Sequence, residues 1–305
     1  MPSKSSTDGT DVSARWQALI SDRNLLVRLI SALILVPIVL IDIWVGQWWF
    51  AALVVFGIGA ATREWVRMIG GQASKPVAPV IILAMIAAAL GVAFLLVPND
   101  LVAAADRARA LQIDVTFMLI MVIGVCALTF ALGIITDVKQ RVPMALGVPY
   151  LLLPAIALIW MREQPEGLRL IIYLMIVVWA TDTGAYLVGR LIGGAKLAPT
   201  ISPNKTWSGA IGGTLIAGLS GLAIGLWFGT ELPVVAFSLA LFLAVISQFG
   251  DLLESGIKRN YAVKDSGGFI PGHGGILDRV DGLLAAAVGL ALFHGLLLAL
   301  GYQWW

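Results

Sequence analysis

Residues 77–97 read VAPVIILAMIAAALGVAFLLV and contain no charged side chain. A helix needs about 20 mainly apolar residues to cross the hydrocarbon core of a bilayer, which is roughly 30 Å thick. Apolar runs of about this length recur along the chain, near residues 25–43, 46–62, 77–97, 113–135, 143–160, 168–189, 209–229, 233–253 and 280–300. The sequence therefore predicts an all-α, polytopic integral membrane protein with about nine transmembrane helices.

The composition supports this fold class. Of the 305 residues, 59% are hydrophobic and 12% are charged, whereas a soluble domain is about 25% charged. These values exclude a water-soluble enzyme, and a formal net charge of +2 gives no indication of nucleic-acid binding. We expect a polar N-terminal tail (1–24), an N-terminal region of five spans (25–160), and a C-terminal region of four spans and two inner loops (161–305).

The positions of Lys and Arg predict the orientation in the membrane, because loops on the cytoplasmic side carry an excess of both. With the N-terminus inside, 16 of the 20 Lys and Arg residues fall on the inner side. The other four are Arg107, Arg109, Arg162 and Arg169. The sequence therefore predicts an N-in, C-out topology.

Glycines recur at multiples of four residues in the seventh expected span. They are Gly209, Gly213, Gly221, Gly225 and Gly229. Small residues at this spacing allow two helices to approach closely. We expect this span to pack tightly on a neighbouring helix.

The few polar residues gather at the inner ends of the C-terminal spans. Asp251, Glu254, Ser255 and Lys258 follow at i, i+3, i+4 and i+7, so a helix places them on one face. Asp278 and Asp281 share a face in the same way at the start of the last span, and Asp182 lies near the inner end of the sixth. Carboxylates at membrane depth are costly and indicate a functional site.

The loop between the last two spans is basic and rich in glycine. Residues 264–275 read KDSGGFIPGHGG, and glycines allow backbone N–H groups to approach an anion closely. Asp oxygens hold Mg²⁺ together with substrate phosphates, while Lys and Arg neutralise the remaining phosphate charge. The combination indicates a site for a polyphosphate and a second phosphate, suited to displacement at phosphorus.

Two sequence blocks carry a family resemblance. SGIKR at 255–259, KD at 264–265 and PGHGGILDRVD at 271–281 resemble the signature of phosphatidate cytidylyltransferases, also called CDP-diacylglycerol synthases. DTGAY at 182–186, GR at 189–190, KL at 196–197 and ISPNKT at 201–206 are also similar to this family. The strong likeness covers about the C-terminal 40% of the chain, and the N-terminal spans match only in being hydrophobic.

The resemblance implies a reaction, cofactors and a location. The reaction would be CTP + phosphatidate → CDP-diacylglycerol + pyrophosphate, a step of phospholipid biosynthesis. It would use Mg²⁺, with room for a second, monovalent or divalent cation. We expect a homodimer in a bacterial-type cytoplasmic (inner) membrane, surrounded by membrane lipids, with the active site facing the cytoplasm and no nucleic-acid partner.

The resemblance also suggests roles for individual residues. The metal ligands would be Asp251 and Asp278, supported by Asp182. The catalytic residues would be Lys258, Arg259, Asp281 and Ser255. The residues expected to bind substrate would be Ser202, Asn204, Lys205, Thr206, Lys264, His273, Gly274, Gly275 and Arg279. At Ser208 the family often has an acid, so we leave this position out of the site.

Two other functional classes remain open at this point. Asp182 and Asp251 within spans are also compatible with a proton- or cation-coupled transporter, although the polar residues cluster at one membrane face. Another CTP-dependent lipid-phosphate enzyme, such as a CTP-dependent lipid kinase or a CDP-archaeol-type synthase, would share the CTP and the metal. A structural scaffold gives no reason for the basic glycine-rich loop.

Overall fold

The computed structural model describes residues 37–97, 104–268 and 274–302, and for residues 104–116 the backbone only. Eight helices in this part of the chain are long and apolar enough to cross a membrane. They are α3 (Gln47–Gly70), α4 (Ala78–Leu96), α5 (Ala104–Ile135), α6 (Arg141–Arg162), α7 (Gly167–Ile192), α8 (Trp207–Trp227), α9 (Pro233–Asn260) and α10 (Leu277–Ala299). This confirms the predicted all-α polytopic fold. Most of the first expected span, 25–43, lies outside the described residues.

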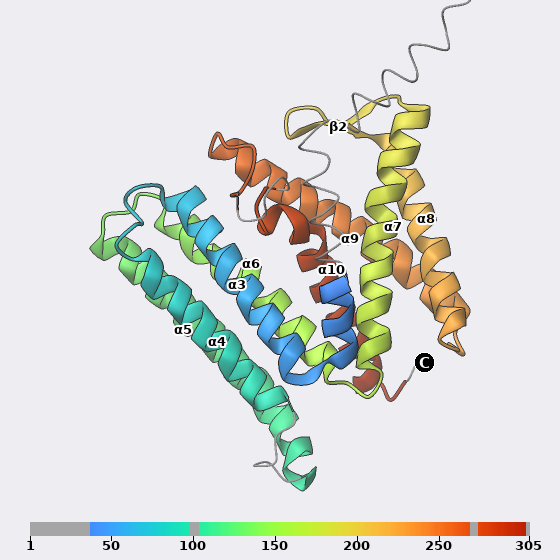
Figure 1. Ribbon diagram of the computed structural model, residues 1–305, viewed down its shortest axis with the longest axis horizontal. Helices are drawn as coiled ribbons and strands as arrows, with labels where there is room; N and C mark the ends of the chain where they lie inside the picture. The colour runs from blue at the N-terminus through green and yellow to red at the C-terminus, as the bar shows by residue number, and fades with distance from the viewer. Residues whose placement is uncertain (1–36, 98–103, 269–273, 303–305) are drawn as a thin grey trace, which may run out of the picture.

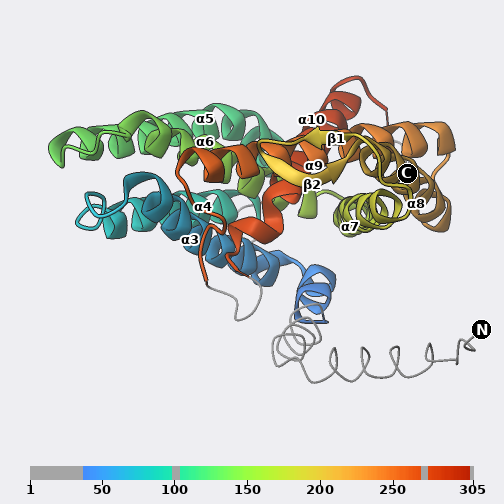
Figure 2. The same cartoon turned by 90° about the horizontal axis from the view of Figure 1, so that it is seen from above.

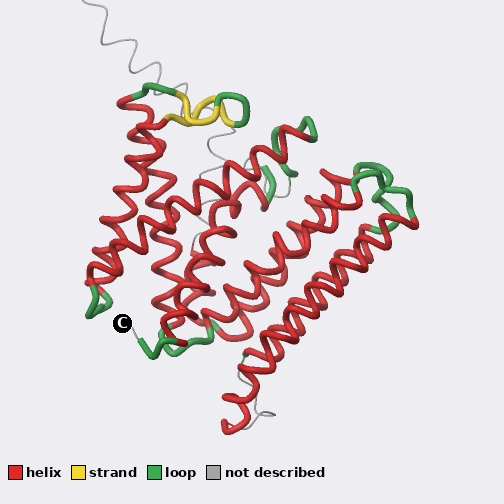
Figure 3. Tube along the Cα trace, turned by 180° about the vertical axis from the view of Figure 1, so that it is seen from behind, coloured by secondary structure: helices red, strands yellow, loops and turns green. Residues whose placement is uncertain are grey.

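Successive helices run in alternating directions, so the connections lie at two ends of the bundle (Figures 1 and 3). α3, α5, α7 and α9 end, and α4, α6, α8 and α10 begin, toward one end of the bundle, while α4, α6 and α8 end, and α5, α7 and α9 begin, toward the other. The first of these ends holds the basic loops that the sequence places inside. Which end faces the cytoplasm stays a prediction.

The helices pack as two groups that meet along α10. α3, α4, α5 and α6 contact one another, as do α7, α8 and α9, while α10 packs on α9 and also on α6, α7 and α3. Figure 2 shows the two groups side by side. Residues on both sides of the expected boundary at 160/161 therefore come together at the start of α10, and the division into two regions stays a prediction.

The glycines of α8 allow it to lie directly on α7 and α9. A Cβ on Gly213 would lie 2.6 Å from the Thr181 carbonyl oxygen of α7, and one on Gly225 would lie 2.9 Å from Ala236 Cβ of α9. This confirms close packing through the glycine repeat. Gly229 is the exception, because it follows the helix end in a turn with φ of 79° and no atom near its Cβ position.

The α7–α8 connection folds into a small antiparallel hairpin that the sequence interpretation missed. β1 (Lys196–Ala198) pairs with β2 (Ser202–Thr206), with Lys196 opposite Thr206 and Ala198 opposite Ser202. β2 leads straight into α8, where the Thr206 hydroxyl accepts a hydrogen bond from Gly209 N at 3.1 Å. This N-cap fixes the hairpin relative to the membrane helices.

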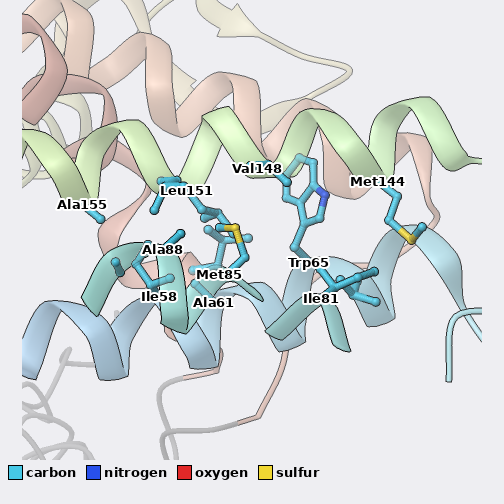
Figure 4. Close-up of a cluster of buried hydrophobic side chains, with 14 of the residues drawn as sticks. Ile58, Ala61, Trp65, Ile81, Met85, Ala88, Met144, Val148, Leu151 and Ala155 are labelled. Carbon is cyan, nitrogen blue, oxygen red and sulfur yellow. The ribbon is translucent and has the colours of Figure 1, made fainter. Parts of the chain in front are cut away.

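Helix α3 extends eight residues beyond the expected span end at 62. The reason is a buried stripe that continues past the apolar run, with Ala61, Trp65 and Ile69 at helical spacing. Trp65 lies 5.1 Å from Tyr150 between ring centroids and donates to the Pro143 carbonyl at 3.3 Å. Figure 4 shows Trp65 within a cluster from α3, α4 and α6. The C-terminal turns of α3 are thereby anchored on α6.

Candidate active site

The C-terminal part of α9 and the start of α10 are in very close contact. A Cβ on Gly250 would lie 2.8 Å from the Asp281 carbonyl oxygen, and one on Gly282 would lie 3.2 Å from the Ser247 carbonyl oxygen. A larger residue at Gly250 would force the backbone of α10 to shift, and one at Gly282 would make a tight contact, so the backbones meet here without intervening side chains. The acidic residues that follow on α9 and that begin α10 therefore face one another across a short gap.

Lys258 lies at the centre of this gap. Its Nζ is 2.6 Å from the Glu254 carboxylate on the same helix and 2.8 Å from the Asp278 carboxylate on α10. Lys258 is 9% exposed and Glu254 is fully buried. We call Lys258, Glu254 and Asp278 the Lys258 cluster. One buried cation thus faces a fully buried carboxylate, that of Glu254, and a partly exposed one, that of Asp278.

Asp278 also organises the α9–α10 connection. Its carboxylate accepts hydrogen bonds from Ser266 N at 3.0 Å and from Gly275 N at 2.9 Å. Gly274, with φ of 84°, provides the left-handed turn that brings the loop back to α10. The two described ends of the glycine-rich loop, at Ser266 and Gly275, are therefore held by one acidic side chain.

Asp251 forms a separate ion pair with the hairpin. Its carboxylate contacts Lys205 Nζ of β2 and accepts a hydrogen bond from Ser255 Oγ at 3.3 Å. Ser255 and Lys258 thus both lie on the polar face of α9 that the sequence predicts. The two aspartates expected to bind metal, Asp251 and Asp278, are each paired with a different lysine.

A polar cavity of about 610 Å³ opens between the hairpin and helices α7, α8 and α9. Hydroxyl, amide and charged side chains line it, namely Asp182, Ser202, Asn204, Lys205, Gln248 and Asp251. Gln248 is held by a hydrogen bond to Thr214 Oγ1 at 2.9 Å. We call this space the polar cavity.

An apolar cavity of about 410 Å³ extends between α3, α6, α7 and α10. Its walls include Phe50, Gly57, Leu151, Met175 and Leu284, and the charged residues in its lining are Asp182 and Arg279. Asp182 therefore lines both cavities. A hydrophobic space and a polar space meet at one carboxylate in the C-terminal half of α7.

Several expected site residues lie apart from the Lys258 cluster. Arg259 is exposed, and its Nε donates to the Ile201 carbonyl at 3.2 Å, which ties α9 to the hairpin turn. Lys264 is exposed, and His273 lies outside the described residues. Ser208, where the family often has an acid, donates to the Gly193 carbonyl and so supports the hairpin base.

The donor chemistry of this region fits Mg²⁺, which prefers carboxylate oxygens and substrate phosphates. Asp281 of α10 lies close enough to Glu254 and Asp251 of α9 for their charges to interact, so acids of α9 and α10 are close neighbours. Within the described residues, no group of three or more His, Cys, Asp or Glu side chains has metal-binding geometry. The metal assignment to Asp251 and Asp278 stays a prediction.

Glu64 is a site residue that the sequence interpretation missed. It comes from α3 in the N-terminal region, is 5% exposed, and reaches the α9–α10 connection through Ser266, Ile276 and Leu277. A signal was present in the sequence, because Glu64 falls on the buried stripe of α3, three residues after Ala61. Its neighbours Arg63 and Arg67 are exposed.

The fold and the site define a helical membrane protein in which a charged polar cavity adjoins an apolar one. The sequence matches the cytidylyltransferase family over residues 26–297, and the chain belongs to this family. A relative from Brucella suis biovar 1 (strain 1330) is 40% identical over 277 residues, covering 88% of this chain and 93% of its own length. A relative from Staphylococcus aureus (strain COL) is 47% identical over 124 residues, covering 40% of this chain and 48% of its own. Both are named phosphatidate cytidylyltransferase.

Proposed function

We propose that the chain catalyses CTP + phosphatidate → CDP-diacylglycerol + pyrophosphate, with one substrate in each cavity. Two relatives, 40% and 47% identical to this chain over their aligned residues, are named phosphatidate cytidylyltransferase. Their names support this activity and a role in phospholipid biosynthesis. The observation that carries the assignment of the cavities is their junction at Asp182. An amphiphilic acceptor and a charged nucleotide need such adjoining spaces.

The polar cavity suits CTP. Lys205 supplies positive charge for phosphates, while Ser202 and Asn204 supply hydrogen-bonding groups for ribose, base or phosphate. The Lys205–Asp251 pair is already formed, so the ammonium group is held in place before substrate arrives. Binding of the triphosphate requires Lys205 to share its charge between Asp251 and the substrate.

The apolar cavity suits an acyl chain of phosphatidate. Its lining on α7 runs from Asp182 back to Ile171, which is about 16 Å at a rise of about 1.5 Å per residue. That length is about half of a hydrocarbon core of roughly 30 Å, or one leaflet. Arg279 in the same lining provides a cation for the lipid phosphate.

The chemistry needs positioning and charge neutralisation more than a base. A phosphatidate phosphate oxygen forms the new bond to the α-phosphorus of CTP, and the bond from that phosphorus to the bridging oxygen of the β-phosphate breaks. Pyrophosphate leaves with the bonding electrons. The attacking oxygen is already anionic, so Lys205, Lys258 and Arg279 act by offsetting the charge of the three CTP phosphates and of the lipid phosphate.

Mg²⁺, held by Asp251 and Asp278 with support from Asp281, would neutralise further phosphate charge when bound. The remaining expectations also belong to this proposal. They are a second cation, a homodimer in a bacterial inner membrane, and an active site that faces the cytoplasm. Membership of a cytidylyltransferase family favours the enzyme over the transporter considered from the sequence.

The direct test is an assay of purified protein with phosphatidate, CTP and Mg²⁺, scored for pyrophosphate and CDP-diacylglycerol. We expect both products in equal amounts, and none after addition of a chelator. Omission of phosphatidate serves as the control for simple CTP hydrolysis. Pyrophosphate release that does not depend on phosphatidate contradicts the proposed reaction.

A further inference from the structure

Glu64 of α3 holds the start of α10 from the other helix group. Its Oε1 accepts a hydrogen bond from Ile276 N at 3.1 Å, and its Oε2 accepts from Leu277 N at 2.9 Å and from Ser266 Oγ at 3.0 Å. These amides are among the first of α10, which have no partner within the helix. A carboxylate here is also favoured by the positive end of the helix dipole.

The same loop segments bind a second carboxylate, that of Asp278. Ser266 donates its hydroxyl to Glu64 and its backbone N–H to Asp278. Gly275 N donates to Asp278, while the next two amides in the chain donate to Glu64. The loop ends are therefore held between Glu64 on one side and Asp278 on the other.

The glycines of the loop make room for Glu64. A Cβ on Gly267 would lie 2.6 Å from Glu64 Oε1, and a Cβ on Gly275 would lie 2.6 Å from Glu64 Oε2. Any other residue at these positions would push the carboxylate away. The glycine-rich signature thus serves a protein carboxylate in this structure, and the sequence alone suggested only an anionic ligand.

Helix α3 gives Glu64 a fixed base. The adjacent Trp65 is 4% exposed, packs on Tyr150 and donates to the Pro143 carbonyl of α6. The same helix lines the apolar cavity through Phe50, Gly57 and Ala61. The position of the α3 helix is therefore transmitted through Glu64 to the first turn of α10, which carries Asp278.

We propose that Glu64 is a positioning residue for the cytidylyltransferase reaction. It does not touch substrate. It fixes Ser266 and the first turn of α10, so that Asp278 keeps its contact with Lys258 at 2.8 Å. This inference rests on the proposed function, and it assigns a part in catalysis to the N-terminal helices, which lack the signature motifs.

The test compares Glu64→Gln with the wild type and with Glu231→Gln, which changes an exposed glutamate between α8 and α9 as a matched control. In the Glu64→Gln variant an NH₂ group replaces one carboxylate oxygen. This group cannot accept hydrogen bonds, so the hydrogen bonds to that atom are lost. We expect kcat to fall about 100-fold, the effect typical of a small misplacement of reacting groups. KM for CTP and the stoichiometry of CTP binding should stay within about twofold of wild type, because the nucleotide contacts are intact.

Ser266→Ala provides a milder second variant, because it removes one donor to Glu64 and keeps the backbone amides. We expect about a tenfold fall in kcat with unchanged CTP stoichiometry. If Glu64→Gln does not yield folded protein, the kcat of Ser266→Ala tests the inference. Wild-type kcat in either folded variant, or a loss of activity that matches a loss of CTP-binding sites, overturns the inference. An inactive wild-type protein would instead refute the proposed function.

Discussion

Replacement of Lys258 by Ala should damage both the stability and the activity of the protein. Lys258 is the buried cation between the buried carboxylate of Glu254, at 2.6 Å, and the partly exposed carboxylate of Asp278, at 2.8 Å. Removal of one partner from a buried ion pair costs about 3–5 kcal/mol of folding free energy. Loss of a preorganised charge at a phosphoryl-transfer site lowers kcat by roughly 100- to 1,000-fold.

A second variant separates these two effects. Combining Lys258→Met with Glu254→Gln removes one positive and one negative charge, so the cluster keeps its net charge. Because a neutral replacement of a buried ion pair is often close to neutral in stability, we expect most of the folding free energy to return. The activity should not return, since the ammonium group is still absent.

The assay has two parts. Unfolding of the detergent-solubilised protein by a denaturing detergent gives the difference in folding free energy, and CDP-diacylglycerol formation from labelled CTP gives kcat. Recovery of activity together with stability in the double variant would show that Lys258 is only structural. A Lys258→Ala protein with wild-type stability would refute the burial argument itself.

Asp278→Asn should leave the protein in the membrane but lower CDP-diacylglycerol formation about 100-fold or more, because it removes the charge that faces Lys258; near-normal turnover of labelled CTP would argue against any role of Asp278 in the site. Gly57→Leu should raise KM for phosphatidate about tenfold and leave CTP binding unchanged, because Gly57 lines the apolar cavity and has no atom within 4 Å of its Cβ position. An unaltered lipid KM would place the acyl chain elsewhere. Thr206→Ala should cost about 1 kcal/mol of stability through loss of the α8 N-cap, whereas Thr206→Ser, which keeps the capping oxygen, should unfold like wild type; equal unfolding of both variants would contradict the capping role.

The membrane helices and the polar face of α9 could be predicted from the sequence because both depend on local periodicity. Apolar runs of bilayer length predicted the helices. The i, i+4 spacing of Glu254 and Lys258 predicted that both lie on one helix face, and their 2.6 Å contact confirms this. The ends of the helices could be predicted less well. Helices α3 and α9 extend beyond their apolar runs because a buried stripe continues on one side while the other side is polar.

The partners of the charged residues could not be predicted from spacing. Lys205 and Asp251 are far apart in the chain, and only the hairpin β1–β2 brings them together. Glu64 lies more than 200 residues before its partners Ser266 and Leu277. Such contacts depend on how α3, α9 and α10 pack, and the sequence contains only an indirect signal, a carboxylate on an otherwise apolar stripe.

The most direct measurement of the central claim follows the fate of individual phosphorus atoms of CTP. Purified protein is supplied with phosphatidate and with CTP labelled at either the α- or the γ-phosphorus, and the lipid extract is then counted. Cytidylyl transfer at the junction of the two cavities predicts that the α label enters the lipid and the γ label leaves as pyrophosphate. Appearance of the γ label in the lipid would instead identify a CTP-dependent lipid kinase and contradict this account.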